Sequence, residues 1–248
     1  MIYLNPEYRS LFGEDDFWTW FRRECPESRF MDEGVPTDGD IILQYAVLGP
    51  WQGRGRSVAL LWELYPQMVE YGFHSAADHE KVARMHACAK AAWKKTAPTP
   101  LSASYFGGKE IDIMPIGVDA KKFRPVTIYG DTPTRAYWCG SSHPMKGYDL
   151  LDDELTRRGL ECRPFLKERP VTQQVLVDEM ELCDCWIRTS RLPCFYLSEW
   201  EAIMSGLPMI VAEGACRSEF HETIGRYEAC ALGWDRDISR WMRYLELE

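Results

Sequence analysis

A loop in the C-terminal half of the chain, residues 189–196, has the features of an anion-binding site. An apolar strand is predicted before it, over 185–188, and a helix after it, over 197–204. The first backbone N–H groups of a helix have no partners within the helix and attract negative charge. We therefore expect the amides of Leu197 and Ser198 to hold a phosphate.

Charged residues elsewhere are further candidates for chemistry. Lys146 is predicted at the start of a helix, where a cation opposes the helix dipole, so an anionic ligand would explain it better than solvent exposure does. Glu63, at a strand end, is a candidate general base or acceptor contact, or an ordinary loop carboxylate. Arg54 and Arg56, in a glycine-rich segment, could bind phosphate, sulfate or a nucleic-acid backbone, or lie in a solvated turn.

The sequence does not predict a metal site. Asp235 and Asp237 form a DxD-like triplet, but it precedes the final helix, where helix capping is the expected role. His79 and His86 share one face of a predicted helix and lack ligand partners. We expect Lys146 and helix amides to neutralise a bound anion without a metal.

Length and composition limit the classes of protein. The 248 residues suffice for one large domain or two small ones, and the net charge of −9 does not indicate a broad nucleic-acid surface. Early acidic residues interrupt any signal peptide, and no apolar run approaches the roughly 20 residues of a membrane helix. Nine cysteines without a CxxC pair indicate free thiols in a reducing cytoplasm.

Strands and helices alternate along the chain, which predicts an α/β fold. In the first half, segment 40–48 is an apolar strand expected at the centre of a sheet, 77–95 a long helix and 100–104 a weak strand. The second half has predicted strands over 135–139, 161–166, 185–188 and 208–212, and helices over 146–158, 172–182 and 197–204. The unit 185–212 is strand, helix, strand, so its strands should be parallel.

We predict two Rossmann-like domains, both reduced in size. The N-terminal domain would span residues 1–120, and the C-terminal domain would span residues 121–248. The final helix, 238–247, is expected to pack back on the N-terminal domain.

Four segments resemble, in order, motifs of retaining GT-B glycosyltransferases of family 4, the glycogen-synthase-like group. Residues 114–125 (MPIGVDAKKFRP) resemble the hinge P-N-G-V-D…F-x-P. Gly140-Ser141 with Lys146-Gly147 resembles G-R…K-G. Residues 201–208 (EAIMSGLP) resemble E-A-M-A-x-G-L-P, and residues 218–219 (SE) resemble P-E.

The resemblance implies a GT-B fold with a ligand cleft between two domains and a nucleoside-diphosphate sugar bound in the C-terminal one. Lys146 would hold the donor diphosphate, and Glu201 would hold the ribose hydroxyls. UDP is the expected nucleotide, with GDP and ADP as alternatives. The implied donor site comprises Gly140, Ser141, Lys146, Leu166, Lys167, Phe195, Tyr196, Leu197, Ser198 and Glu201.

The chain departs from the family pattern at positions that matter for catalysis. Pro193 occupies the position of the carboxylate near the transferred sugar, Ser141 that of the diphosphate-binding arginine, and Trp62 that of a histidine in the N-terminal motif. Glu199 is a candidate replacement for the lost carboxylate, although it lies on a different helical face from Glu201. The chain is also short, similar to compact phage or bacterial transferases.

These features predict a cytoplasmic glycosyltransferase, in the host cytoplasm if phage-encoded, that acts with retention. Its acceptor would be a saccharide or a modified DNA base as in phage systems, bound on the side of Trp51, Arg54 and Arg56. A non-catalytic nucleotide- or sugar-binding module is the alternative that Pro193 and Trp62 favour. A sugar-nucleotide epimerase is the second alternative.

Overall fold

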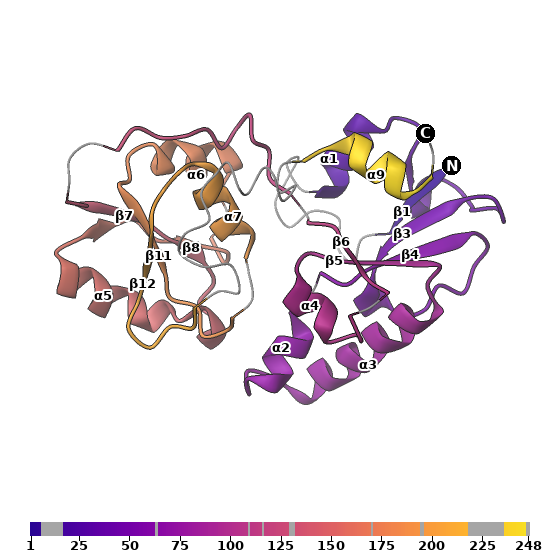
Figure 1. Ribbon diagram of the computed structural model, residues 1–248, viewed down its shortest axis with the longest axis horizontal. Coiled ribbons are helices and arrows are strands. Elements are labelled where there is room, and N and C mark those ends of the chain that lie inside the picture. Colours follow the sequence, from indigo (N-terminus) through magenta and orange to yellow (C-terminus); the bar gives the residue numbers. More distant parts are fainter. Residues whose placement is uncertain are drawn as a thin grey trace. The chain divides into compact units, whose positions relative to one another are not determined.

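The computed structural model describes residues 1–5, 17–62, 64–108, 110–115, 117–128, 132–169, 171–193, 196–217 and 236–246. The chain forms two compact units (Figure 1). Unit 1 comprises Met1–Ile116 together with Asp237–Glu248, and unit 2 comprises Gly117–Arg236. The C-terminal helix α9 (Ile238–Tyr244) therefore belongs to unit 1.

Unit 1 is built on a six-stranded sheet in which all pairings are parallel, in the order β2-β1-β3-β4-β5-β6. The strands are β1 (Ile2–Asn5), β2 (Arg29–Phe30), β3 (Ile41–Tyr45), β4 (Arg56–Leu60), β5 (Lys94–Ala97) and β6 (Asp112–Ile113). The helices, besides α9, are α1 (Phe17–Glu24), α2 (Tyr65–Glu70), α3 (Ala76–Ala91) and α4 (Pro100–Ser104).

Helices cover both faces of this sheet, which is why its central strands are apolar on both sides. Val58 and Leu60 of β4 share a core cluster with residues of α1 and α9, and Ala59 shares a second cluster with Met85 of α3. Trp62 lies in the first cluster, with its ring centroid 4.7 Å from that of Phe17. The residue at the family's histidine position is thus a core residue here.

Unit 2 contains a four-stranded parallel sheet in the order β12-β11-β7-β9 and a parallel pair, β10-β8. The strands are β7 (Arg135–Tyr137), β8 (Cys139–Gly140), β9 (Glu161–Cys162), β10 (Phe165–Leu166), β11 (Cys185–Arg188) and β12 (Met209–Val211). The helices are α5 (Leu151–Arg158), α6 (Gln173–Met180) and α7 (Leu197–Met204). The predicted helix 197–204 and strand 185–188 are confirmed with their bounds.

The structure corrects three local predictions. The weak strand expected over 100–104 is helix α4, because Thr99 accepts a hydrogen bond from the Ser102 amide and Pro100 occupies the first turn. The helix expected over 77–95 ends at Ala91, and its last residues belong to β5.

The third correction concerns Lys146, which does not begin an α-helix. It ends a short 3-10 turn, Pro144–Lys146, and α5 begins only at Leu151. Gly147 interrupts the helix with a positive φ of 62°, a conformation that glycine adopts without strain. The argument that Lys146 opposes a helix dipole therefore does not apply.

Within the described residues, none of the helices is long and apolar enough to cross a membrane.

Candidate functional site

The candidate site lies at the carboxyl end of strand β11 in unit 2, where the chain turns into the loop before helix α7. Ligands of open parallel sheets bind outside the carboxyl ends of the strands. A pocket of about 20 Å³ lies here, which is room for about one water molecule. Its lining comes from β7, β8, β11, the loop and α7: Tyr137, Trp138, Cys139, Lys146, Trp186, Ile187, Arg188, Thr189, Ser190, Tyr196, Ser198 and Glu199.

Lys146 and Tyr196 meet at this pocket. The Lys146 ammonium nitrogen lies 2.8 Å from the centroid of the Tyr196 ring, a cation–π contact. The Tyr196 hydroxyl accepts a hydrogen bond of 2.9 Å from the Ser190 hydroxyl. Tyr196 also occupies the N-cap position of α7, without a capping hydrogen bond from its side chain. The expected donor residues Lys146, Tyr196 and Ser198 are therefore brought together.

The position of Lys146 is fixed by a close approach of two backbone segments. The Thr189 hydroxyl donates to the Lys146 carbonyl at 2.6 Å and accepts from the Trp138 indole at 2.8 Å. A Cβ atom at residue 147 would lie 2.0 Å from the Thr189 carbonyl oxygen, so Gly147 is the only residue type that fits. The sequence resemblance found Lys146-Gly147; the structure gives the reason for the glycine.

Arg188 links the strand, the loop and the helix, and is a residue to which the sequence reading gave no role. Its side chain is fully buried and forms an ion pair with Glu199 of α7. Its guanidinium also donates to the Leu192 carbonyl at 2.6 Å and to the Cys216 carbonyl at 2.7 Å. The sequence holds one signal for Arg188: it is a charged residue at the end of an otherwise apolar strand, CWIR.

Glu201 is buried in α7, 5 % exposed, and is not among the residues that line the pocket. Its carboxylate accepts a hydrogen bond of 3.4 Å from the Gln173 amide. Burial raises the pKa of Glu201 to about 7, and the Gln173 hydrogen bond and the charge of Arg236 only partly oppose this. A ribose bound to Glu201 would have to reach a carboxylate that the fold already encloses.

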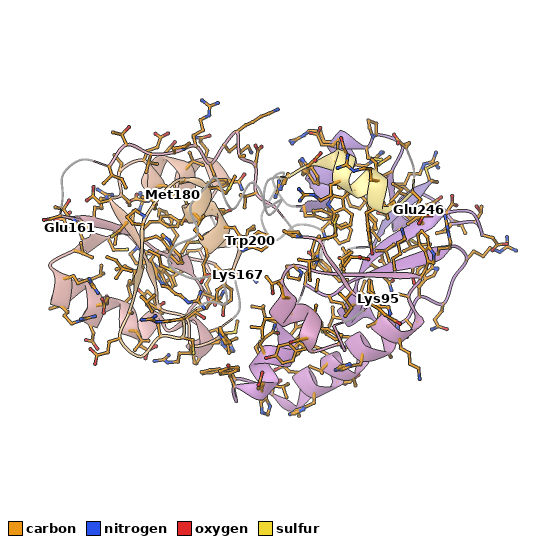
Figure 2. The ribbon with its side chains drawn as sticks, viewed as in Figure 1. Lys95, Glu161, Lys167, Met180, Trp200 and Glu246 are labelled. Carbon is orange, nitrogen blue, oxygen red and sulfur yellow. The ribbon has the colours of Figure 1, made fainter. Side chains whose placement is uncertain are left out.

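The other expected donor residues lie along the β8–β10 pair. Leu166 pairs with Gly140, and the Lys167 amide donates to the Gly140 carbonyl at 2.7 Å. Lys167 is exposed at the end of β10 (Figure 2), and Ser141 follows β8 in a half-buried position. Cys139 of β8 lines the pocket, which connects this pair of strands to the site. Phe195 lies outside the described residues.

The expected acceptor residues lie near the amino edge of the unit 1 sheet. Arg56 is paired with Ile41, the first residue of β3, so it marks the amino edge of the unit 1 sheet. Arg54 forms an exposed ion pair of 3.7 Å with Asp38. The Trp51 indole donates to the Arg54 carbonyl at 2.8 Å. Parallel sheets bind ligands at the carboxyl edge, so this geometry does not favour an acceptor site here.

Glu63, the candidate general base, lies outside the described residues. In the described part of the chain, no three His, Cys, Asp or Glu side chains form a group that could hold a metal ion. The Asp237 carboxylate accepts from the Ser239 amide at 2.9 Å and so caps α9. His79 contacts His74 at 3.1 Å.

Comparisons with known proteins identify the fold. No family model and no curated protein match the sequence. Among solved structures, the chain is similar to a sucrose-phosphate synthase from Thermosynechococcus elongatus, with a TM-score of 0.52 and 15% identity over 69% of this chain and 55% of that one. It is also similar to TarM, with a TM-score of 0.51 and 10% identity over 73% of this chain and 42% of that one.

The chain spans about half the length of these two structures. At such low identity the likeness shows the fold alone. The predicted fold class is confirmed: the chain is a mixed α/β protein with parallel sheets, consistent with Rossmann-like GT-B neighbours.

Proposed function

We propose that the protein is a glycosyltransferase that binds a nucleoside-diphosphate sugar in unit 2. The observation that carries the proposal is the contact between the Lys146 ammonium and the ring of Tyr196, the residue that precedes α7, at one pocket. The pocket lies at the carboxyl edge of a parallel sheet, the usual ligand edge of such folds.

Sugar transfer from a nucleotide requires a cation and hydrogen-bond donors beside the diphosphate. The leaving diphosphate gains negative charge as the bond to the sugar breaks, and preorganised cations and amide dipoles stabilise that charge. Lys146 would supply a positive charge, and the first-turn amides of Leu197 and Ser198 would supply hydrogen-bond donors. UDP is the proposed nucleotide, and the acceptor would be a saccharide or a modified DNA base. Retention rests on the motif resemblance.

A thermal-shift panel with UDP, GDP, ADP, TDP and their sugars tests donor binding. A ligand at 100 times its dissociation constant adds roughly 2.7 kcal/mol to the free energy of unfolding. We expect Lys146→Ala to abolish the response. Lys90→Ala, on the exposed surface of α3 in unit 1, is the control and should respond like the unmodified protein. No shift with any nucleotide would refute the donor site.

A binding module without catalysis is the second candidate, and two observations favour it. Pro193 stands where the resemblance expects a carboxylate near the sugar. The pocket also holds only about one water molecule, so side chains must move before a sugar can enter. Chromatography of products after incubation with a nucleotide sugar and an acceptor panel separates the two candidates. Binding without release of the nucleoside diphosphate would support the module.

A further inference from the structure

Glu199 carries an oxygen atom that the fold leaves without a hydrogen-bond partner. The side chain is buried, 2 % exposed, in the first turn of α7. Its Oε1 atom pairs with Arg188, whereas its Oε2 atom is buried and has no hydrogen-bond partner among the residues that the structure describes. Native proteins rarely leave a buried carboxylate oxygen in this state, because the lost hydration is not compensated. The atom therefore calls for a partner from outside the chain.

The surroundings limit what that partner is. Glu199 lines the same pocket as Lys146 and Ser198. An ionised carboxylate only accepts hydrogen bonds, so the partner must be a donor. A phosphate oxygen would be repelled, and a cation would compete with the Lys146 ammonium. A neutral hydroxyl group can donate a hydrogen bond and carries no charge, so it fits this position.

Arg188 makes such a carboxylate compatible with an anionic ligand. The guanidinium is fully buried beside Glu199, so the pair has no net charge. The Glu199 carboxylate therefore does not repel a diphosphate bound at Lys146. Because Arg188 also holds the Leu192 carbonyl, the loop and the carboxylate are fixed together.

We propose that Glu199 Oε2 accepts a hydrogen bond from a hydroxyl group of the nucleotide sugar whose diphosphate binds at Lys146. This inference rests on the proposed function. The hydroxyl has two sources, the transferred sugar and the ribose, and both are adjacent to the diphosphate. Glu199 is a binding residue in either case.

Calorimetric titration of Glu199→Gln with UDP-glucose and with UDP tests the proposal. Glutamine keeps the shape and an oxygen for Arg188, but it places an NH₂ donor where Oε2 was. We expect the affinity for UDP-glucose to fall roughly 10- to 100-fold, the loss of a hydrogen bond to a charged group. An unchanged affinity for UDP would assign the hydroxyl to glucose, and an equal loss would assign it to ribose.

Glu154→Gln is the matched control. Glu154 is also a buried glutamate of unit 2, 2 % exposed and paired with Arg157 and Arg158, but it does not line the pocket. Its variant should bind both ligands like the unmodified protein. An equal loss of affinity in both variants would contradict the assignment, because it would come from general loosening of unit 2.

A second variant covers the case in which Glu199→Gln does not fold. In Arg188→Met/Glu199→Leu both charges are removed together, which proteins tolerate far better than one unpaired buried charge. It should show the same loss for UDP-glucose. If either folded variant binds UDP-glucose like the unmodified protein, the role of Glu199 is overturned, but the proposed function is not. Failure of the unmodified protein to bind any nucleotide overturns the proposed function, and the role of Glu199 with it.

Discussion

Loss of one partner of the buried Arg188–Glu199 ion pair should destabilise the protein strongly. Both side chains are almost completely inaccessible, 0 % and 3 % exposed. The attraction between them is therefore little screened by water, and each charge depends on the other for its solvation. Replacement of one partner and replacement of both should have very different effects.

Arg188→Met leaves the Glu199 carboxylate buried without a counter-charge. Breaking a buried pair in this way costs about 3–5 kcal/mol of the free energy of unfolding. In the double variant Arg188→Met/Glu199→Leu no charge remains unpaired. The Leu192 and Cys216 carbonyl groups still lose a donor, which costs about 1 kcal/mol each. The double variant should therefore be more stable than the single one by about 1–3 kcal/mol.

Urea unfolding followed by circular dichroism measures these differences. Arg157→Met is the control, because Arg157 is 50% exposed and its partner Glu154 keeps Arg158. Because Glu154 keeps its ion pair with Arg158, Arg157→Met should cost less than Arg188→Met. A loss of less than about 1 kcal/mol in the free energy of unfolding of Arg188→Met would contradict this expectation. A double variant no more stable than the single one would contradict it as well.

Three further changes have defined outcomes. Gly147→Ala should unfold at a lower urea concentration and lose nucleotide binding, because its Cβ would lie 2.0 Å from the Thr189 carbonyl oxygen. Gly159→Ala is the control, because Gly159 has a similar φ of 66° and open space around it. This control should lose only about 1 kcal/mol of the free energy of unfolding. The pKa of Glu201 is raised from 4.5 to about 7, so the folded state binds the extra proton and stability falls as pH rises from 4.5 to 7. Glu201→Gln should then exceed the unmodified protein by about 3 kcal/mol at pH 8 and match it below pH 4.5 in urea unfolding; equal stability at both pH values would contradict the burial argument. Arg54→Ala should change neither urea stability by more than about 1 kcal/mol nor the thermal shift with nucleotides, since its ion pair is exposed; a lost thermal shift would place a ligand at this loop after all.

The local architecture around the site follows from the sequence. The apolar strand over 185–188 and the helix over 197–204 have the predicted bounds. Apolar runs and helix-stop residues act within a few positions of the chain, so they can be read without the fold. For the same reason the alternation of strands and helices predicted the α/β class correctly.

Which residues meet at the pocket depends on how distant segments of the chain pack together. Arg188 reaches the Cys216 carbonyl and Glu199 because the chain returns to β11 after α7. Gly147 ends the 3-10 turn at Lys146 because the Thr189 backbone approaches it, a contact that helix propensity does not encode. The parallel register of β3 and β4 places the loop of Arg54 at the amino edge of the unit 1 sheet. Such contacts depend on how distant segments pair, and a single sequence records only the local preferences of each segment.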